Sequence, residues 1–264
     1  MNIMRKIFIS LLALIFIVLT ILLNSLEPNG VAILEYHTIT STPDEDGERY
    51  NVYPNDFSAQ LDYLQDNGYN TITIEDFVRS TRGEFELPDK AIILTFDDGY
   101  ADNYQNMLPI LQAHNMKAVV YIIANELGKP GYLTVEQVLD LQKQGIEIGN
   151  HTANHRPLIG LSESELNHEI RDSKLYLEYL GIYNVDNFSY PNGLYNDDVM
   201  AVLKNNSYHS AVTGDAGLNN ADTDLLKLQR INIPQPRLGI TEFKLRLLKG
   251  ILFSKLEINQ HRIK

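Results

Sequence analysis

Short apolar runs alternate with helix-like patterns along most of the chain. Several runs are continuously apolar, as is typical of strands buried on both faces of a parallel sheet. Eight runs are interpreted as strands: Val31–Glu35, Thr71–Ile74, Ala91–Phe96, Ala118–Ile123, Ile146–Gly149, Asn187–Tyr190, Ser210–Thr213 and Leu228–Ile233. This alternation predicts an α/β fold with a parallel sheet. Seven or eight strands in one domain favour a (β/α)7-8 barrel over an open sheet.

Capping residues mark helix boundaries between these strands. Thr134 with Gln137, and Ser162 with Glu165, have the spacing of an N-cap and the polar residue three positions later, which predicts a helix start at each. Gly181 predicts the end of the second helix, because glycine readily adopts the left-handed conformation found after many helices.

The N-terminus has the features of a targeting segment. Arg5 and Lys6 precede an uncharged apolar run from Ile7 to Leu23, which is near the lower length limit for crossing a membrane. We expect residues 1–30 to form a cytoplasmic leader, a transmembrane signal anchor and a linker, because a basic flank stays in the cytoplasm. The rest of the chain would be extracytoplasmic, held by a single pass at a bacterial cell membrane. A secreted form is the alternative, although no small-x-small cleavage pattern follows the run.

Composition narrows the classes of partner and site. The formal net charge of the 264-residue chain is −12, which argues against a nucleic-acid partner because phosphate binding needs a basic surface. The chain contains no Cys, which excludes a disulfide framework, a thiolate metal site and a cysteine nucleophile.

A basic amphipathic segment, residues 241–264, follows the expected domain of residues 31–240. Its apolar positions include Phe243, Leu247, Ile251 and Leu252. An apolar face opposite Lys and Arg side chains suggests contact with a membrane surface or a partner. An ordinary C-terminal helix packed on the domain is the alternative.

Polar side chains directly follow four of the expected strands. His37 follows the first strand, and the pair Asp97 and Asp98, His151 and the turn at residues 191–193 follow three others. In a parallel barrel these strand ends open on the same face, where the active sites of such barrels lie. We therefore expect these side chains to converge.

The types and spacing of these residues suggest a metal site. His151 and His155 are spaced i and i+4, which on a helical turn places both imidazoles on one side. Two imidazoles, a carboxylate and an open position suit a catalytic zinc-type ion. Asp97 and Asp98 end an apolar strand, where two carboxylates need a cationic partner. The alternatives are two surface histidines and an Asp-Asp-Gly turn. Both are weakened because the histidine pair and the aspartate pair occur together at strand ends.

Three motifs together resemble a known family. Thr-Phe-Asp-Asp-Gly-Tyr at residues 95–100 and His-Thr-x-x-His at residues 151–155 resemble the first two motifs of the family-4 carbohydrate esterases, the polysaccharide deacetylases, which share the NodB-homology domain. Phe-Ser-Tyr-Pro-Asn-Gly at residues 188–193 resembles the third. The resemblance covers roughly residues 31–234. It implies a distorted (β/α) barrel and removal of acetyl groups from chitin, peptidoglycan, biofilm poly-N-acetylglucosamine or acetylated xylan.

The resemblance also implies roles for the motif residues. Asp98, His151 and His155 would hold one divalent metal ion, expected to be Zn²⁺. Asp97 would be the general base that takes a proton from the attacking water. The backbone N–H of Asn192 would help to hold the oxyanion, with Tyr190 and Pro191 beside it in the substrate site.

Two departures from the family pattern affect the remaining roles. The family often has an Arg two residues before the third-motif Pro, where it orients the base. Ser189 occupies that position here, so Arg230 is a candidate for this role, with a surface cation as the alternative. The usual late histidine motif is also missing. The run Ala-Ile-Leu-Glu-Tyr-His that ends at His37 resembles instead the circularly permuted branch, which includes the biofilm poly-β-1,6-N-acetylglucosamine deacetylases. His37 is therefore the expected general acid.

We thus expect a membrane-tethered N-deacetylase whose partner is a polysaccharide containing N-acetylglucosamine. An O-acetyl esterase acting on a wall polysaccharide is the first alternative, because the same metal site serves both reactions. An inactive carbohydrate-binding module is the second. The intact set of Asp97, Asp98, His151 and His155 argues against it, since inactive relatives usually lose at least one such residue.

Overall fold

The computed structural model of the chain describes residues 5, 30–42 and 50–255. Within these residues, eight parallel strands form one curled sheet in the order β10-β1-β5-β6-β7-β8-β9, and β4 pairs with the edge of β5. The strands are β1 (Ala32–Tyr36), β4 (Asn70–Thr71), β5 (Ala91–Phe96), β6 (Val119–Ile122), β7 (Glu147–Asn150), β8 (Asn187–Ser189), β9 (Ser210–Val212) and β10 (Ile231–Asn232). The expected α/β fold with a parallel sheet is confirmed.

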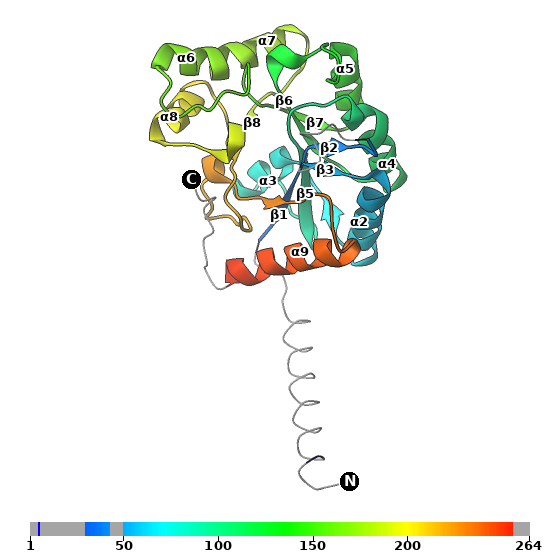
Figure 1. Cartoon of the computed structure of the whole chain (residues 1–264). Coiled ribbons are helices and arrows are strands. Elements are labelled where there is room, and N and C mark those ends of the chain that lie inside the picture. Colours follow the sequence, from blue (N-terminus) through cyan, green and yellow to red (C-terminus); the bar gives the residue numbers. More distant parts are fainter. Residues whose placement is uncertain (1–4, 6–29, 43–49, 256–264) are drawn as a thin grey trace.

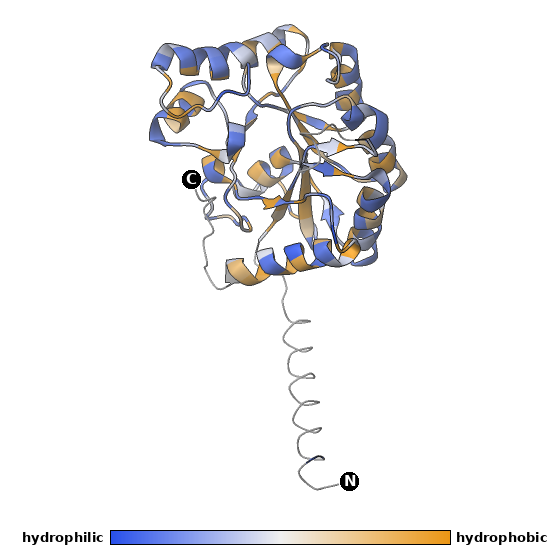
Figure 2. Cartoon of the chain, viewed as in Figure 1, coloured by the Kyte–Doolittle hydropathy of each residue, from blue (hydrophilic) through white to orange (hydrophobic). Residues whose placement is uncertain are grey.

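Helices pack around the sheet (Figure 1). They are α2 (Pro54–Asp66), α3 (Ile74–Thr81), α4 (Leu108–Ala113), α5 (Val135–Lys143), α6 (Glu163–Asn167), α7 (Ser173–Tyr179), α8 (Asp197–Asn205) and α9 (Ile240–Lys255). Shorter turns are η2 (Asn103–Met107), η3 (Ala124–Glu126), η4 (His168–Asp172), η5 (Pro191–Gly193) and η6 (Leu225–Lys227). The central strands are apolar, whereas the helices are mixed, with polar residues outward (Figure 2).

Both predicted capping boxes are present. The hydroxyls of Thr134 and Ser162 accept hydrogen bonds from the backbone N–H groups of Gln137 and Glu165, whose side chains bond back to the N-cap backbone. Two strand predictions were wrong in their bounds: the strand expected at residues 228–233 is limited to Ile231–Asn232, and the one expected at residues 71–74 stops at Thr71. Thr73 forms a third capping box there and starts α3, so side-chain capping ends the extended conformation.

A single segment joins the two edges of the curled sheet. Leu228 accepts a hydrogen bond from the backbone N–H of Thr213 (2.8 Å) and donates one to the carbonyl of Ala211 (2.9 Å). Three residues later, Ile231 pairs with Leu34 of β1. The chain therefore crosses from β9 to β1 within a few residues, which is consistent with the expected distorted (β/α)7-8 barrel.

Side chains on β1 alternate between two environments, as the period of a strand requires. Leu34 and Tyr36 belong to the large cluster that packs against the helices, whereas Ile33 belongs to the smaller cluster enclosed by the sheet. By the same alternation, Glu35 and His37 lie on the same side of the sheet as Ile33, the side that the sheet encloses. Enclosed positions are thus apolar deep in the sheet and become ionisable toward the carboxyl ends of the strands.

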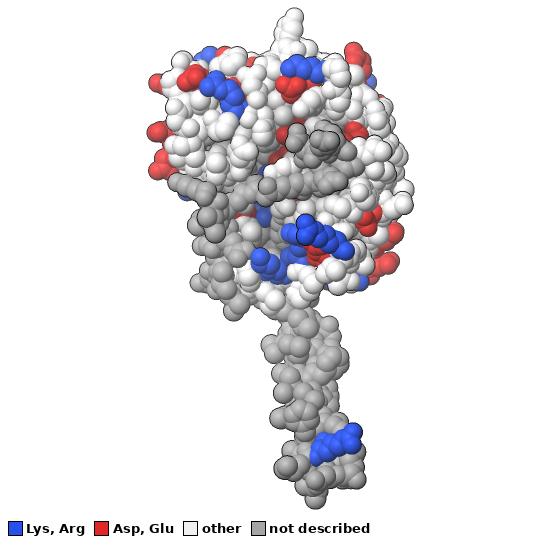
Figure 3. All heavy atoms as spheres, viewed as in Figure 1, with Lys and Arg blue, Asp and Glu red and all other residues white. Residues whose placement is uncertain are grey.

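The C-terminal helix is part of the packed domain. Phe243, Leu247 and Ile251 of α9 are buried in the same cluster as residues of α2 and β10. The expectation that this apolar face contacts a membrane is therefore wrong, because these side chains are already covered, and the packed-helix alternative is correct for them. Lys and Arg side chains gather over α9 on the outer surface (Figure 3).

The predicted transmembrane segment, Ile7–Leu23, and the end of the basic segment, residues 256–264, lie outside the described residues. Among the helices that the structure does describe, none has the length and apolarity needed to span a membrane.

Candidate metal centre and active site

The carboxyl ends of the strands open into one cavity of about 570 Å³. It is lined by His37 after β1, Asp97 and Asp98 after β5, and His151 after β7. His155, Tyr190, Asn192 and Arg230 also line it. The structure therefore brings the sequence-predicted site residues together at this edge of the sheet, except for Pro191, which is buried and begins the η5 turn.

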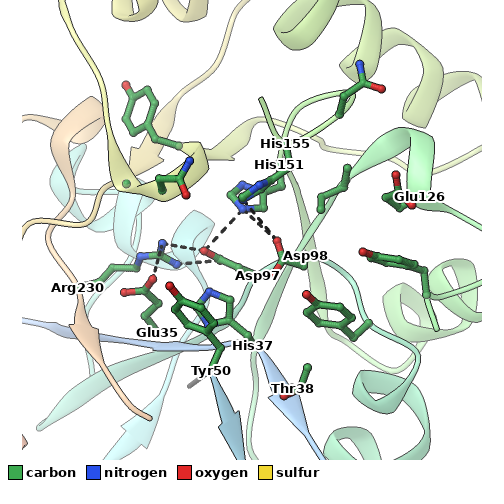
Figure 4. Close-up of a pocket in the computed structure, with 17 residues that line it drawn as sticks. Glu35, His37, Thr38, Tyr50, Asp97, Asp98, Glu126, His151, His155 and Arg230 are labelled. Carbon is green, nitrogen blue, oxygen red and sulfur yellow. Dashed lines mark hydrogen bonds and ion pairs between the residues drawn. The ribbon is translucent and has the colours of Figure 1, made fainter. Parts of the chain in front are cut away.

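Three side chains have their potential ligand atoms within 4.8 Å of one another: Asp98, His151 and His155. Asp98 Oδ1 lies 3.5 Å from His151 Nε2 and 3.6 Å from His155 Nε2 (Figure 4). Two imidazole nitrogens and one carboxylate oxygen are the donor set of many catalytic zinc sites.

Backbone geometry, and not a helix, produces this cluster. The sequence reasoning placed His151 and His155 on one helical turn, but they lie in an irregular turn after β7. Thr152 and His155 have positive φ angles of 70° and 55°, and the Thr152 hydroxyl accepts a hydrogen bond from the backbone N–H of His155 (2.8 Å). Asp98 also lies in the left-handed region, with φ 75°. Strained backbone of this kind is common at functional sites.

His151 is arranged to present one nitrogen to an ion. Its Nδ1 lies 2.7 Å from the carbonyl oxygen of Ser189, which can only accept a hydrogen bond. Nδ1 therefore carries the proton, and Nε2 is left with a lone pair directed toward Asp98 and His155. Burial lowers the pKa of His151, which favours the neutral form that a metal requires. The donor set thus fits a divalent ion.

Asp97 is bound from the opposite side of the cavity by Arg230. The guanidinium NH1 lies 2.8 Å from Oδ1 and NH2 lies 2.8 Å from Oδ2, and the Ser189 hydroxyl donates to Oδ2 at 3.1 Å. Burial alone would raise the pKa of Asp97, but the positive charge of Arg230 outweighs it and holds the pKa well below the usual range. Asp97 is therefore an ionised, oriented carboxylate.

His37 lies beside two carboxylates. Ligand-type atoms of Glu35, His37 and Asp97 are all within 4.8 Å of one another. Glu35 Oε1 is also 3.5 Å from Arg230 NH2. The ring of Tyr50 covers one side of His37, with a centroid separation of 4.8 Å. His37 thus has the position expected of a proton donor opposite the Asp98 cluster, with Asp97 between them (Figure 4).

The η5 turn forms another wall of the cavity. Asn192 has φ 58°, and Gly193, with φ 71°, packs so closely on Gly214 that a Cβ would lie 2.3 Å from the Gly214 nitrogen. Only glycine fits at residue 193, so the turn is held in place. The Tyr190 hydroxyl donates to the carbonyl of Leu226 (3.0 Å), which gives this ring a packing role.

Sequence reasoning missed Glu35 and Tyr50. Glu35 carried a detectable signal, because an ionisable residue inside an otherwise apolar strand needs a buried partner. Tyr50 carried none, since it lies in a polar stretch. It comes beside His37 where β2 (Thr38–Ile39) pairs with β3 (Asn51–Val52).

The matching family profile and two relatives of this chain are all described as deacetylases that act on polysaccharides. The family profile described as polysaccharide deacetylase matches residues 85–211. The Bacillus subtilis (strain 168) protein YxkH, named as a polysaccharide deacetylase, is 32% identical over 207 residues, which are 78% of this chain and 72% of the relative. The poly-β-1,6-N-acetyl-D-glucosamine N-deacetylase of Staphylococcus epidermidis is 23% identical over 231 residues, 78% of this chain and 79% of the relative.

Solved structures resemble the same region. The Streptococcus pyogenes deacetylase PplD, solved in complex with acetate, has a TM-score of 0.76 and 30% sequence identity, covering 85% of this chain and 99% of that one. IcaB from Ammonifex degensii shares the fold, with a TM-score of 0.73 at 20% identity over 85% of this chain and 98% of its own. His37 and Arg230 lie outside the family-profile match, so their roles are argued from geometry.

Proposed function

Because the chain belongs to the polysaccharide deacetylases, a family of hydrolases, we propose that it removes acetyl groups from N-acetylhexosamine residues of an extracellular or cell-wall polysaccharide. One observation carries this proposal: a potential base, a potential acid and a metal-type donor set line the same cavity. They are Asp97, His37 and the cluster of Asp98, His151 and His155. Amide hydrolysis needs all three functions within reach of one acetyl group.

Asp98, His151 and His155 would hold one divalent ion, for which Zn²⁺ is the expected choice given two imidazoles and one carboxylate. When bound, such an ion supplies Lewis-acid chemistry: it polarises the acetyl carbonyl and makes a water more acidic. The Ser189 carbonyl keeps His151 in the tautomer that this role requires.

Asp97 accepts the proton of the attacking water in this mechanism. As the water oxygen bonds to the carbonyl carbon, its proton passes to the carboxylate that Arg230 and Ser189 hold in place. The bidentate contact fixes the carboxylate plane, so the remaining acceptor direction can face the cavity.

His37 delivers a proton to the departing nitrogen. An amide anion is a very poor leaving group, so the carbon–nitrogen bond breaks only as that nitrogen gains a proton. The products are acetate and a free amino sugar. The backbone N–H of Asn192, in the η5 turn that lines the cavity, would help to hold the developing oxyanion.

The substrate and location complete the proposal. A named relative acts on poly-β-1,6-N-acetyl-D-glucosamine, which supports a polymer containing N-acetylglucosamine. We further infer that residues 1–30 anchor the domain in a bacterial membrane with the active site outside. The basic leader and the apolar run of the sequence support this topology.

Acetate release from defined oligosaccharides tests the function. Purified protein is incubated with β-1,4- and β-1,6-linked N-acetylglucosamine oligomers and with O-acetylated sugars, with and without a chelator. Acetate from N-acetylated oligomers, lost on chelation and restored by Zn²⁺, is the expected result. Release from O-acetylated sugars alone would favour the esterase alternative, and no release from any substrate would reject catalysis.

A further inference from the structure

Three side chains from one turn of helix hold the backbone that follows His37. The amide of Asn103 donates to the His37 carbonyl (3.0 Å), and the amide of Asn106 donates to the Ile39 carbonyl (2.7 Å). The carboxylate of Asp102 accepts from the Ile39 N–H (2.9 Å). Both polar backbone groups of Ile39 are thus bound by side chains of this one turn.

These hydrogen bonds hold the backbone beyond the point where the hydrogen-bond ladder of the main sheet ends. The ladder between β1 and β5 ends at the pair Tyr36 and Phe96, and the Asp97 N–H makes a last bond to the Tyr36 carbonyl (3.0 Å). Beyond it, β2 leaves the sheet and, among the described residues, pairs only with the two-residue β3. Without other support, the position of His37 relative to Asp97 would depend on a very short pairing.

The turn that carries Asp102, Asn103 and Asn106 contains features that destabilise the fold, which argues that it is retained for a function. Asn103 is fully buried, and its side-chain oxygen has no hydrogen-bond partner among the described residues. An unsatisfied buried acceptor is destabilising. Burial also raises the pKa of Asp102, to about 6. Residues 103–107 form a π-helical turn, a rare conformation that is frequent at functional sites.

We propose that Asp102, Asn103 and Asn106 are positioning residues that set the distance between the acid His37 and the base Asp97. The three lie within the ten residues that begin at Asp97, so one continuous segment carries the base and a metal ligand and also fixes the acid. This inference rests on the proposed function, because it assumes that His37 donates a proton to the leaving nitrogen.

The test compares two substrates whose leaving groups differ. Asn103→Leu and Asn106→Ala are assayed on an N-acetylglucosamine oligomer, whose nitrogen needs a proton, and on nitrophenyl acetate, whose leaving group needs none. A small displacement of a catalytic group lowers turnover strongly, so kcat on the oligomer should fall about 10- to 100-fold, with KM little changed. Loss on the ester should stay below about 3-fold, with bound zinc unchanged.

Asn206→Ala is the matched control. The Asn206 amide also donates to a backbone carbonyl, that of Val202 (2.8 Å), and is similarly half-buried, but it ends α8 away from the cavity. It should leave both activities unchanged. If Asn103→Leu does not fold, Asn106→Ala decides, because its side chain is only half-buried.

The results that would overturn the inference are specific. Equal losses on both substrates would show a general structural role. No loss in either variant would show that the hydrogen bonds from Asn103 and Asn106 are not needed to position His37. His37→Ala provides the reference. If His37→Ala is selective for the oligomer and the asparagine variants are not, only the positioning role fails. If His37→Ala itself shows no selectivity, the acid assignment and this inference both fail.

Discussion

Arg230 holds both carboxylate oxygens of Asp97 through two parallel contacts of 2.8 Å each. The pair is buried, and the same guanidinium also faces Glu35 at 3.5 Å. One guanidinium therefore contacts two buried carboxyl groups at the mouth of the curled sheet. Since lysine cannot form the bidentate contact, this site is specific for arginine.

Arg230→Lys should lower turnover about 10- to 100-fold, the usual range for residues that orient a catalytic group, while zinc affinity stays unchanged. Arg230→Met should also lower the free energy of unfolding by about 3–5 kcal/mol, because it leaves two buried carboxylates uncompensated. Steady-state kinetics and urea unfolding measure the two effects. Normal turnover in Arg230→Lys would contradict the orienting role.

Asp97→Asn should retain zinc and lose most activity. An amide side chain cannot accept the water's proton, and a general base typically contributes about 10²–10⁴-fold. Asp98→Asn is the contrasting variant and should lose the metal. Zinc content is measured beside acetate release, and near-normal turnover in Asp97→Asn would exclude this residue as the base.

His37→Ala should retain zinc and lose activity on the acetamide much more than on nitrophenyl acetate, because only the amide nitrogen needs a proton to leave. The ratio of the two kcat/KM values measures the effect. Loss of the metal would instead identify His37 as a ligand, and a constant ratio would remove it as the acid.

Zinc affinity should fall as the pH falls, because the histidine ligands must be neutral to bind. The lowered pKa of His151 means that protons compete at this nitrogen only in more acidic solution than for an exposed histidine. Competition titrations against a coloured chelator between about pH 5 and pH 8 follow the affinity. An affinity independent of pH over this range would contradict a ligand set containing imidazoles.

Glu147, at the start of β7, should make stability depend on pH. Burial raises its pKa from 4.5 to about 7, although it accepts hydrogen bonds from Glu75 N–H and the Asn187 amide. Between these values the folded state binds the proton more strongly than the unfolded state does. This group's contribution to stability is therefore present at low pH and is lost as the pH rises through about 7.

Glu147→Gln should remove that dependence. The stability of the variant relative to the natural protein should increase by on the order of 1–3 kcal/mol between pH 5 and pH 8. Activity should be unchanged, because Glu147 lies at the opposite end of its strand from His151. Urea unfolding at several pH values measures the difference, with the exposed Glu84→Gln as control. Parallel profiles for Glu147→Gln and the natural protein would refute the assignment.

The sheet could be predicted because each strand is determined by a short apolar run in the local sequence. Ala91–Phe96 was predicted with the correct bounds, since a run of six residues that is apolar except for Thr95 has few alternatives next to a polar turn. The end of the strand at residues 71–74 could not, because Thr73 fits both a β-strand and an N-cap, and only the tertiary position of α3 decides between them.

The candidate site could be predicted from the sequence only in part, because some of its contacts join residues far apart in the chain. Adjacent motif residues such as Asp97 and Asp98 are recognisable from local order, but the contact between Arg230 and Asp97 joins residues 133 positions apart. Arg230 could be suggested only by the vacancy at Ser189. The turn that unites His151 and His155 depends on positive φ angles that no spacing rule reveals.

The crossing from Leu228 to Ile231 has a consequence for how the protein becomes active. Because this short stretch carries Arg230, the guanidinium reaches Asp97 only when the last strand docks between β9 and β1. This docking joins Leu34 to Ile231, a contact of high sequence separation, which forms slowly. During synthesis, a chain that has folded through β9 therefore contains the proposed base and metal ligands but lacks Arg230, the proposed orienting group. Catalytic competence is thus acquired together with completion of the fold, and enzyme activity can serve as a direct readout of the final docking step.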